Sequence, residues 1–174
     1  MRVAYADPPY IGCAGLYEGG VEVNHKILID HLTSFDGWAL SCHSPSLKVI
    51  LPMCPDDVRI ASWVKPFCSF KPNVNPAYSW EPVIYKPVRK LGRDHATTKD
   101  HVVASITLKK GLTGAKPPAF CLWLFDLLQM TPTDELHDLF PGTGIAGSQW
   151  EVWKSRKQLD LFSDAEVPEA PPSV

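Results

Sequence analysis

The sequence predicts a single α/β domain, and three features of the 174-residue chain support this. An apolar run at residues 3–6 leads directly into Asp7 and two prolines, as expected for a buried parallel strand that ends there. Segments with strand-like and helix-like patterns then alternate along the chain. A second short strand, at residues 136–139, is followed by a glycine turn and a helix start. The apolar content of 45% suffices for one hydrophobic core.

The first strand stops at Asp7, Pro8, Pro9 and Tyr10, an order that folding alone does not require. The residue before a proline is driven into extended geometry, and proline supplies no N–H to a neighbouring strand. We therefore expect the strand to end as a rigid lip. Ligands of open α/β sheets bind beyond the carboxyl ends of strands, so this lip should line a cleft. The alternative is an ordinary Pro-Pro turn after an edge strand.

The groups on this lip suit methyl transfer to an exocyclic amine of a nucleobase. The lone pair of such an amine is delocalised into the ring, so a general base would help little. Two fixed acceptors, the Asp7 carboxylate and the Pro8 carbonyl, would instead hold both amino hydrogens and stabilise the charge that develops. The Tyr10 ring would stack on a base that has been turned out of its helix.

Helix and strand signals alternate after the lip. The glycine-rich stretch at 11–23 predicts a mobile loop that closes over the cleft. Asn24 predicts the cap of a helix at 25–32, followed by a strand at 38–41. The apolar residues at helical spacing in the helix are Ile27, Leu28 and Leu32.

Ser44 followed by Pro45 predicts a capped helix that runs to about residue 51. Further strands are expected at 58–67 and 80–88, and Pro82 suggests that the second of them is peripheral. A weaker strand signal covers residues 102–108.

A helix is expected at 117–130, with an apolar stripe that should belong to the core. The stripe consists of Phe120, Trp123, Leu124, Leu127 and Leu128. Residues 136–147 then have the pattern of a strand, a glycine turn and a helix start. Glycines let the backbone approach a ligand closely, and the helix start presents free N–H groups to a carboxylate or phosphate.

Charge is distributed unevenly along the chain, although the formal net charge is only -2. Residues 86–116 contain eight cations and two acids, which suggests a polyanion as partner, with a merely solvated loop as the alternative. Few aromatic residues separate the cations, so we expect contacts to phosphates rather than to bases. The cations are Lys86, Arg89, Lys90, Arg93, Lys99, Lys109, Lys110 and Lys116.

Neither a metal site nor a membrane segment is signalled. The five cysteines are odd in number and never spaced as CxxC, and the six histidines are not spaced with them as ligands. We expect reduced cysteines and no metal. The sequence does not open with the charged and then apolar pattern of a signal peptide, and no apolar run approaches the ~20 residues of a transmembrane helix. We therefore expect a cytoplasmic protein without membrane contact.

Two motifs together resemble those of the S-adenosylmethionine-dependent amino-methyltransferases that act on adenine. The tetrad Asp7-Pro8-Pro9-Tyr10 is similar to the catalytic motif of that family, and Asp-Leu-Phe-Pro-Gly-Thr-Gly at 138–144 to its cofactor loop. Lys116-Pro117 resembles the pair that precedes this loop and reaches the methionine carboxylate. The catalytic motif comes first, as in the permuted bacterial and phage enzymes and the eukaryotic mRNA adenosine methyltransferases.

The resemblance implies a Rossmann-like, circularly permuted methyltransferase sheet with flanking helices in residues 1–157. It implies S-adenosyl-L-methionine as cofactor and adenine in DNA as the methylated base. An RNA adenine methyltransferase and a catalytically inactive nucleic-acid-binding module are the alternatives, and a homodimer would fit the permuted enzymes. The implied catalytic residues are Asp7, Pro8, Pro9 and Tyr10. The implied cofactor residues are Asp7, Lys116, Pro117, Asp138, Phe140, Pro141, Gly142, Thr143 and Gly144.

The chain also departs from this family. Many members continue with a strand whose terminal acid holds the ribose hydroxyls, but only about thirty residues follow the glycine turn here. The ribose site is therefore unassigned. We also expect no separate target-recognition domain, so selectivity should be short or relaxed and rest on the basic segment at 86–115 and the loop after Tyr10.

Residues 158–174 are expected to form a disordered acidic tail. Gln158-Leu159-Asp160-Leu161-Phe162 resembles the motif by which bacterial replication and repair proteins dock on the sliding clamp. Leu161 and Phe162 would enter an apolar pocket, while the Gln158 amide fixes the register. Alternatively, this segment packs on the domain as a short edge strand, and Asp160 supplies the missing ribose acid.

Overall fold

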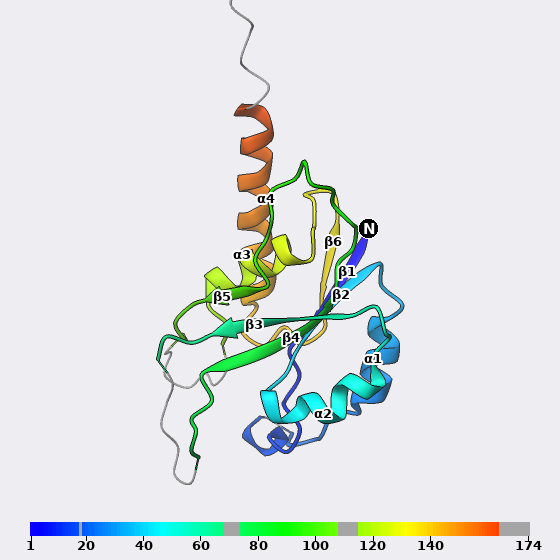
Figure 1. The fold of residues 1–174 in the computed structure, drawn as a ribbon, viewed down its shortest axis with the longest axis vertical. Helices are drawn as coiled ribbons and strands as arrows, with labels where there is room; N and C mark the ends of the chain where they lie inside the picture. The colour runs from blue at the N-terminus through cyan, green and yellow to red at the C-terminus, as the bar shows by residue number, and fades with distance from the viewer. Residues whose placement is uncertain (18, 68–73, 108–114, 164–174) are drawn as a thin grey trace, which may run out of the picture.

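The computed structural model describes residues 1–17, 19–67, 74–107 and 115–163, and a six-stranded sheet lies at its centre (Figure 1). The strand order is β5-β3-β4-β2-β1-β6, and β4 is antiparallel to both of its neighbours while all other pairs are parallel. The strands are β1 (Arg2–Ala6), β2 (Gly37–Ser41), β3 (Arg59–Val64), β4 (Trp80–Lys86), β5 (His101–Val103) and β6 (Glu135–Asp138).

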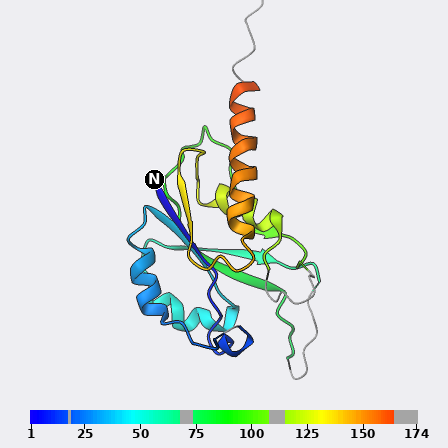
Figure 2. The ribbon, with the colours of Figure 1, turned by 180° about the vertical axis from the view of Figure 1, so that it is seen from behind.

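Helices cover both faces of this sheet (Figures 1 and 2). One face carries α1 (His25–Leu32) and α2 (Leu47–Ile50), and the other carries α3 (Pro118–Leu127) and α4 (Ile145–Ser163). Three short 3₁₀ helices are η1 (Ala14–Leu16), η2 (Ser44–Ser46) and η3 (Leu51–Met53). Across the described ranges, every helix is too short or too polar to cross a bilayer.

Alternate residues of β1 contribute to two hydrophobic cores. Val3 and Tyr5 pack among residues of α3 and α4, whereas Ala4 and Ala6 pack among residues of α1. Successive side chains of a strand point to opposite faces, so an uninterrupted apolar strand must be covered on both sides. This explains why the first strand of the chain lies inside the sheet, between β2 and β6.

The expected helices form largely as predicted. The Asn24 side chain accepts a hydrogen bond from the Ile27 N–H at 3.1 Å and so caps α1. The buried face of α1 consists of Leu28, Ile29 and Leu32, whereas Ile27 is exposed. Residues 28, 29 and 32 lie at the i, i+1 and i+4 positions of one helical face, which turns residue 27 away from the sheet. The whole apolar stripe predicted for α3 is buried.

The predicted peripheral position of the strand at 80–88 is wrong, because β4 lies between β2 and β3. The structure accommodates Pro82 at a place where little pairing is lost. The Pro82 carbonyl accepts a hydrogen bond from the Cys42 N–H at 3.1 Å, one residue beyond the end of β2. The missing N–H of Pro82 therefore removes only the last possible bond between β4 and β2.

Three further elements differ from prediction. Ser44 is the first residue of η2 rather than a cap, and the cap position belongs to His43. The strand predicted at 102–108 is shorter and forms only β5 (His101–Val103), at the edge of the sheet. Helix α4 continues to Ser163, so residues 158–163 are helical rather than the start of a disordered tail. Good helix formers at Lys157, Gln158 and Leu159 explain this continuation.

Candidate active site

The site lies at the carboxyl edge of the sheet, where the parallel strands β1, β2 and β6 end. Tyr5 of β1 pairs with Asp138 of β6, so Asp7 and the loop after β6 leave the sheet side by side. Together they line one small open pocket. Its lining residues are Tyr5, Asp7, Tyr17, Ala115, Lys116, Asp138, Phe140, Pro141, Gly142, Thr143, Ile145 and Ala146. The two sequence motifs, more than 120 residues apart, thus meet in space.

Lys116 lies at the centre of the site, just before α3. Its ammonium nitrogen is 2.8 Å from Asp7 Oδ1, 3.1 Å from the Tyr10 hydroxyl and 3.4 Å from Glu81 Oε2. Its side chain is only 5% exposed. The methionine carboxylate of a cofactor, expected as the partner of Lys116, would have to compete with two carboxylates that already hold this ammonium group. A cation buried between two acids serves first to neutralise them.

Glu81 completes the site from β4, and sequence analysis did not identify it. Its carboxylate accepts a hydrogen bond from the Tyr10 hydroxyl at 2.6 Å and forms a second ion pair with Lys65, which follows β3. A charged residue two positions before the apolar run Val83–Tyr85 was the available signal. We call Asp7, Tyr10, Lys65, Glu81 and Lys116 the carboxyl-edge cluster.

Burial and neighbouring charges set the protonation states of the carboxyl-edge cluster. Burial raises the pKa of Asp7, and the ion pair with Lys116 only partly offsets this while Glu81 adds to it. Burial would also raise the pKa of Glu81, but Lys116 and Lys65 together lower it. The pKa of Lys116 is raised by Asp7 and Glu81 despite the burial that opposes its charge. Lys116 and Glu81 therefore remain charged at neutral pH, and Asp7, whose pKa is raised, protonates more easily than Glu81.

Tyr10 is held on three sides. Its ring lies parallel to that of His43, with centroids 5.3 Å apart and an interplanar angle of 2°, and its hydroxyl contacts Glu81 and Lys116. Burial raises the pKa of Tyr10 well above its usual value. Tyr10 is absent from the lining of the pocket, where the half-exposed Tyr17 stands instead. Tyr17 was not identified from the sequence because it lies in the glycine-rich loop.

The glycine turn after β6 has the backbone geometry that its sequence predicts. Gly142 and Gly144 have φ values of 45° and 71°, in the left-handed region that favours glycine. Asp138 Oδ1 accepts a hydrogen bond from the Phe140 N–H at 3.2 Å, which fixes the start of the turn. Helix α4 begins at Ile145, so its first N–H groups, which lack helical acceptors, face the end of the turn.

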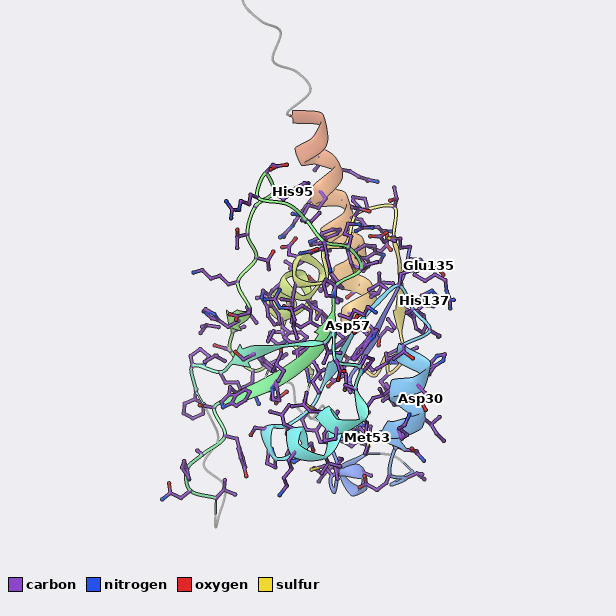
Figure 3. All side chains as sticks on the ribbon, turned by 45° about the vertical axis from the view of Figure 1, so that its right-hand side comes forward. Asp30, Met53, Asp57, His95, Glu135 and His137 are labelled. Carbon is purple, nitrogen blue, oxygen red and sulfur yellow. The ribbon has the colours of Figure 1, made fainter. Side chains whose placement is uncertain are left out.

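Lys116 apart, the described cations of the basic segment lie away from this site. β4 runs antiparallel to β2, so Lys86 pairs with Trp38 near the start of β2, at the amino edge of the sheet. The Lys86 ammonium group is 2.9 Å from the Asp57 carboxylate. Figure 3 shows His95, in the following loop, at the end of the molecule opposite Met53. Lys90, Arg93 and Lys99 are exposed, and Lys109 and Lys110 lie outside the described residues.

Arg89 is part of the fold rather than a free cation. Its guanidinium group is 2.8 Å from Asp134 Oδ1 and also donates to the Gln129 carbonyl. The N-terminal ammonium group of Met1 is 3.1 Å from the same oxygen of Asp134. We call Met1, Arg89 and Asp134 the amino-edge cluster. The predicted contact of Arg89 with nucleic acid would require this cluster to break.

The segment predicted to bind a sliding clamp lies at the end of α4. Leu159 is 69% exposed there, and Gln158 is also at the surface. Asp160, Leu161 and Phe162 are helical, but their side chains lie outside the described part. Docking as an extended peptide would require the last turn of α4 to unwind.

The described residues contain no group of three or more metal-ligating side chains, and the four described cysteines are free. Pro117 caps α3 beside the site through its backbone, and Pro8 is buried.

Comparison with solved structures identifies the fold. The crystal structure of the M1.HpyAVI–SAM complex matches with a TM-score of 0.62 and 14% sequence identity, covering 88% of this chain and 78% of that chain. A crystal structure of M1.HpyAVI matches with a TM-score of 0.60 and 12% identity, covering 88% of this chain and 76% of that chain. The chain has a Rossmann-like methyltransferase fold. No protein-family model and no curated sequence matches it.

Proposed function

We propose that this protein transfers a methyl group from S-adenosyl-L-methionine to the exocyclic amine of adenine in DNA. The observation that carries the proposal is the meeting of Asp7 with the glycine turn at 138–144 in one pocket. The shared fold supports it, since M1.HpyAVI is an adenine-N6 DNA methyltransferase and one matching structure is its SAM complex. Cytosine is a poorer candidate, because cytosine enzymes of this type more often carry serine in place of Asp7.

The residues of the pocket fit this cofactor in two respects. The turn at Gly142 and Gly144 lets the backbone approach a ligand, and the free N–H groups that begin α4 suit a carboxylate. When bound, S-adenosyl-L-methionine supplies an electrophilic methyl group on a sulfonium. Lys116 contacts Asp7 Oδ1, which leaves Oδ2 as the atom that we assign to the amine of the substrate. We therefore assign to Lys116 the role of orienting Asp7, in preference to a contact with the cofactor.

In the proposed reaction, Asp7 and the Pro8 carbonyl hold the two hydrogens of the adenine amine. This arrangement favours a pyramidal nitrogen whose lone pair points toward the methyl group. A bond forms between the nitrogen and the methyl carbon while the carbon–sulfur bond breaks, and one proton of the amine leaves to water afterwards. Asp7 must be ionised to accept, so the ion pair with Lys116 opposes the effect of its burial.

The test is mass spectrometry of nucleosides from DNA and RNA that have been incubated with the protein and S-adenosyl-L-methionine. We expect N6-methyladenine in DNA. Methylation confined to RNA would mean that RNA, and not DNA, is the substrate. No product in either polymer, together with no heat of cofactor binding in calorimetry, would indicate an inactive nucleic-acid-binding module.

We also propose that 1–157 acts as the methyltransferase unit and that the segment from Gln158 binds a bacterial sliding clamp. A peptide of residues 154–174 should bind the clamp in fluorescence anisotropy. Replacing Leu161 and Phe162 by alanine should abolish that binding and leave methylation of short oligonucleotides unchanged. Loss of methylation would show instead that this segment supports the fold.

A further inference from the structure

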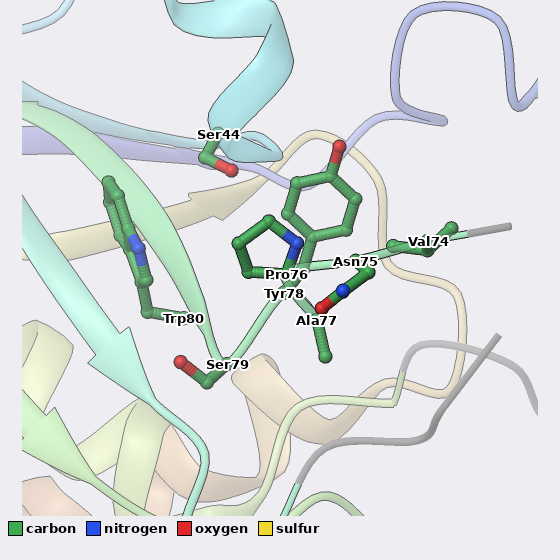
Figure 4. A pocket seen from close by; sticks show the side chains of 8 residues that line it. All are labelled: Ser44, Val74, Asn75, Pro76, Ala77, Tyr78, Ser79 and Trp80. Carbon is green, nitrogen blue, oxygen red and sulfur yellow. The ribbon is translucent and has the colours of Figure 1, made fainter.

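A second pocket lies on the β3–β4 side of the carboxyl-edge cluster, apart from the pocket at the glycine turn. It has a volume of about 420 Å³, within the ~300–1,000 Å³ typical of small-molecule sites. Figure 4 shows the Trp80 ring on one side, Pro76 and Tyr78 on the other, and Ser44 between them. Its lining residues are Ser44, Val74, Asn75, Pro76, Ala77, Tyr78, Ser79 and Trp80.

The walls of this pocket have the composition of a slot for a flat, polar ring. Trp80 and Tyr78 are 38% and 53% exposed, so two large aromatic side chains face solvent instead of the core. Hydroxyl groups of Ser44 and Ser79 and the amide of Asn75 add donors and acceptors to the lining. Aromatic walls with hydrogen-bonding groups at the edge suit a nucleobase, because every base has a π-face and a polar rim.

Two direct chain connections join this pocket to the carboxyl-edge cluster. Ser44 follows His43, whose ring stacks on Tyr10 with centroids 5.3 Å apart. Trp80 precedes Glu81, which accepts the hydrogen bond from the Tyr10 hydroxyl at 2.6 Å. Tyr10 thus contacts His43 and Glu81, which are the chain neighbours of Ser44 and Trp80 in the lining of the pocket.

We propose that this pocket binds the base of a nucleotide next to the one that is methylated. The inference rests on the proposed function. Extrusion of a target nucleotide breaks its stacking on both neighbours, and an adjacent base then needs a new stacking partner. Trp80 and Tyr78 supply that partner, and Ser44 and Asn75 make the pocket sensitive to which base it holds. Sequence selectivity then has a physical basis within this domain.

Binding of fluorescein-labelled single-stranded DNA, measured by anisotropy, tests this without requiring turnover. Stacking of one base is worth about a factor of ten or more in affinity. We expect Trp80→Ala to weaken binding about tenfold and Trp80→Phe, which keeps a ring, to weaken it less than threefold. Tyr78→Ala should act in the same direction. Ile27→Ala, at an exposed apolar position on α1, is the control and should leave affinity unchanged.

An abasic walk then locates the contact. A single abasic site is moved along the oligonucleotide, and the wild-type protein should lose about tenfold in affinity at one position adjacent to the target adenine. Trp80→Ala should be insensitive at that position and normally sensitive elsewhere. Equal losses by both proteins at every position would overturn the proposal, as would unchanged affinity of Trp80→Ala.

The binding result and the methylation result separate the two proposals. Suppose that Trp80→Ala loses its sensitivity to the abasic site at the one adjacent position, but no methyl transfer occurs. The pocket then holds a base, and the proposed activity is wrong. If methylation occurs and Trp80→Ala binds and methylates as the wild type does, the activity stands and the pocket has no such role. A protein that binds no oligonucleotide at all contradicts both.

Discussion

The two edges of the sheet each carry a buried ion pair, and the two pairs differ in how completely their acid is satisfied. At the amino edge, Asp134 is 1% exposed and accepts hydrogen bonds from Arg89, from Thr131 and from the N-terminus. Although burial would raise the pKa of Asp134, these bonds hold it well below its usual range. At the carboxyl edge, Asp7 is 21% exposed, and burial raises its pKa despite the bond from Lys116.

This is the difference that we expect between a structural acid and a reactive one. Asp134 has its lone pairs engaged by the protein, so its charge stabilises the fold and little remains for a ligand. Asp7 shares its cation with Glu81 and faces a pocket, so part of its accepting capacity is open to a substrate. Strongly perturbed acids concentrate at functional sites, but the direction of the shift and the exposure of the group decide which kind is present.

The largest expected effect that tests this comparison is on activity. Asp7→Asn should lower the rate of methyl transfer by roughly 10²–10³-fold, because the loss of one charged acceptor at a reacting centre has about this cost. Its melting temperature should change little. Asp134→Asn, the same chemical change at the other edge, should leave the rate of the folded protein within about twofold. Equal rates for Asp7→Asn and the wild type would remove Asp7 from the reaction.

The second prediction concerns stability. Asp134→Asn should lower the free energy of unfolding by about 2 kcal/mol at pH 7, because it removes hydrogen bonds to a buried charge. The folded pKa of Asp134 is depressed, so its contribution is fully present above the unfolded value of about 4 and is lost as the pH falls further. Urea titrations should therefore show the two proteins converging below pH 4. Asp57→Asn, which breaks an exposed pair, is the control and should cost under about 1 kcal/mol.

The third prediction uses Glu81 as a positioning residue. Glu81→Gln should lower activity about tenfold, because it loosens both Tyr10 and Lys116. Glu81 raises the pKa of Asp7, so its neutralisation should lower that pKa and move the acid limb of the pH–rate profile to lower pH. A purely structural role would reduce the rate without moving this limb.

The fourth prediction, with the smallest expected effect, concerns DNA binding by cations at two different places in the chain. Lys109→Ala with Lys110→Ala should weaken binding to all DNA sequences similarly and lower the slope of log K against log salt by about 2. Lys90→Ala with Arg93→Ala removes the same charge from exposed positions in the loop that follows the amino edge. If this second pair flattens the slope as much, DNA contacts the amino edge as well.

The sequence is sufficient to predict the fold class and half of the site. Asp7, Lys116 and Asp138 could be linked because their motifs together resemble those of one family, and the structure brings all three to one pocket. Glu81 and Lys65 could not be predicted as partners, since each follows or begins an ordinary strand and only the β3–β4 pairing brings them together. Pro82 was misleading because proline in a strand usually indicates an edge.

The basic segment shows a second limit of sequence reasoning. Arg89 and Lys90 are adjacent in the chain and equal in charge, yet one is bound to Asp134 and the other is exposed. No local pattern distinguishes them, because the partner of Arg89 lies 45 residues further along the chain. Ile27 and Ile29 of α1 are different, because the shared helical face of Leu28, Ile29 and Leu32 already distinguishes them.

The place of β1 in the sheet also has a consequence for synthesis of the protein on the ribosome. β1 is made first, and β2 can pair with one of its edges soon afterwards, but the other edge pairs with β6 at residues 135–138. A strand edge without a partner invites pairing with other chains. The nascent protein therefore carries an open apolar edge until β6 has been made. Pausing of translation before β6 should increase aggregation, whereas pausing after it should not.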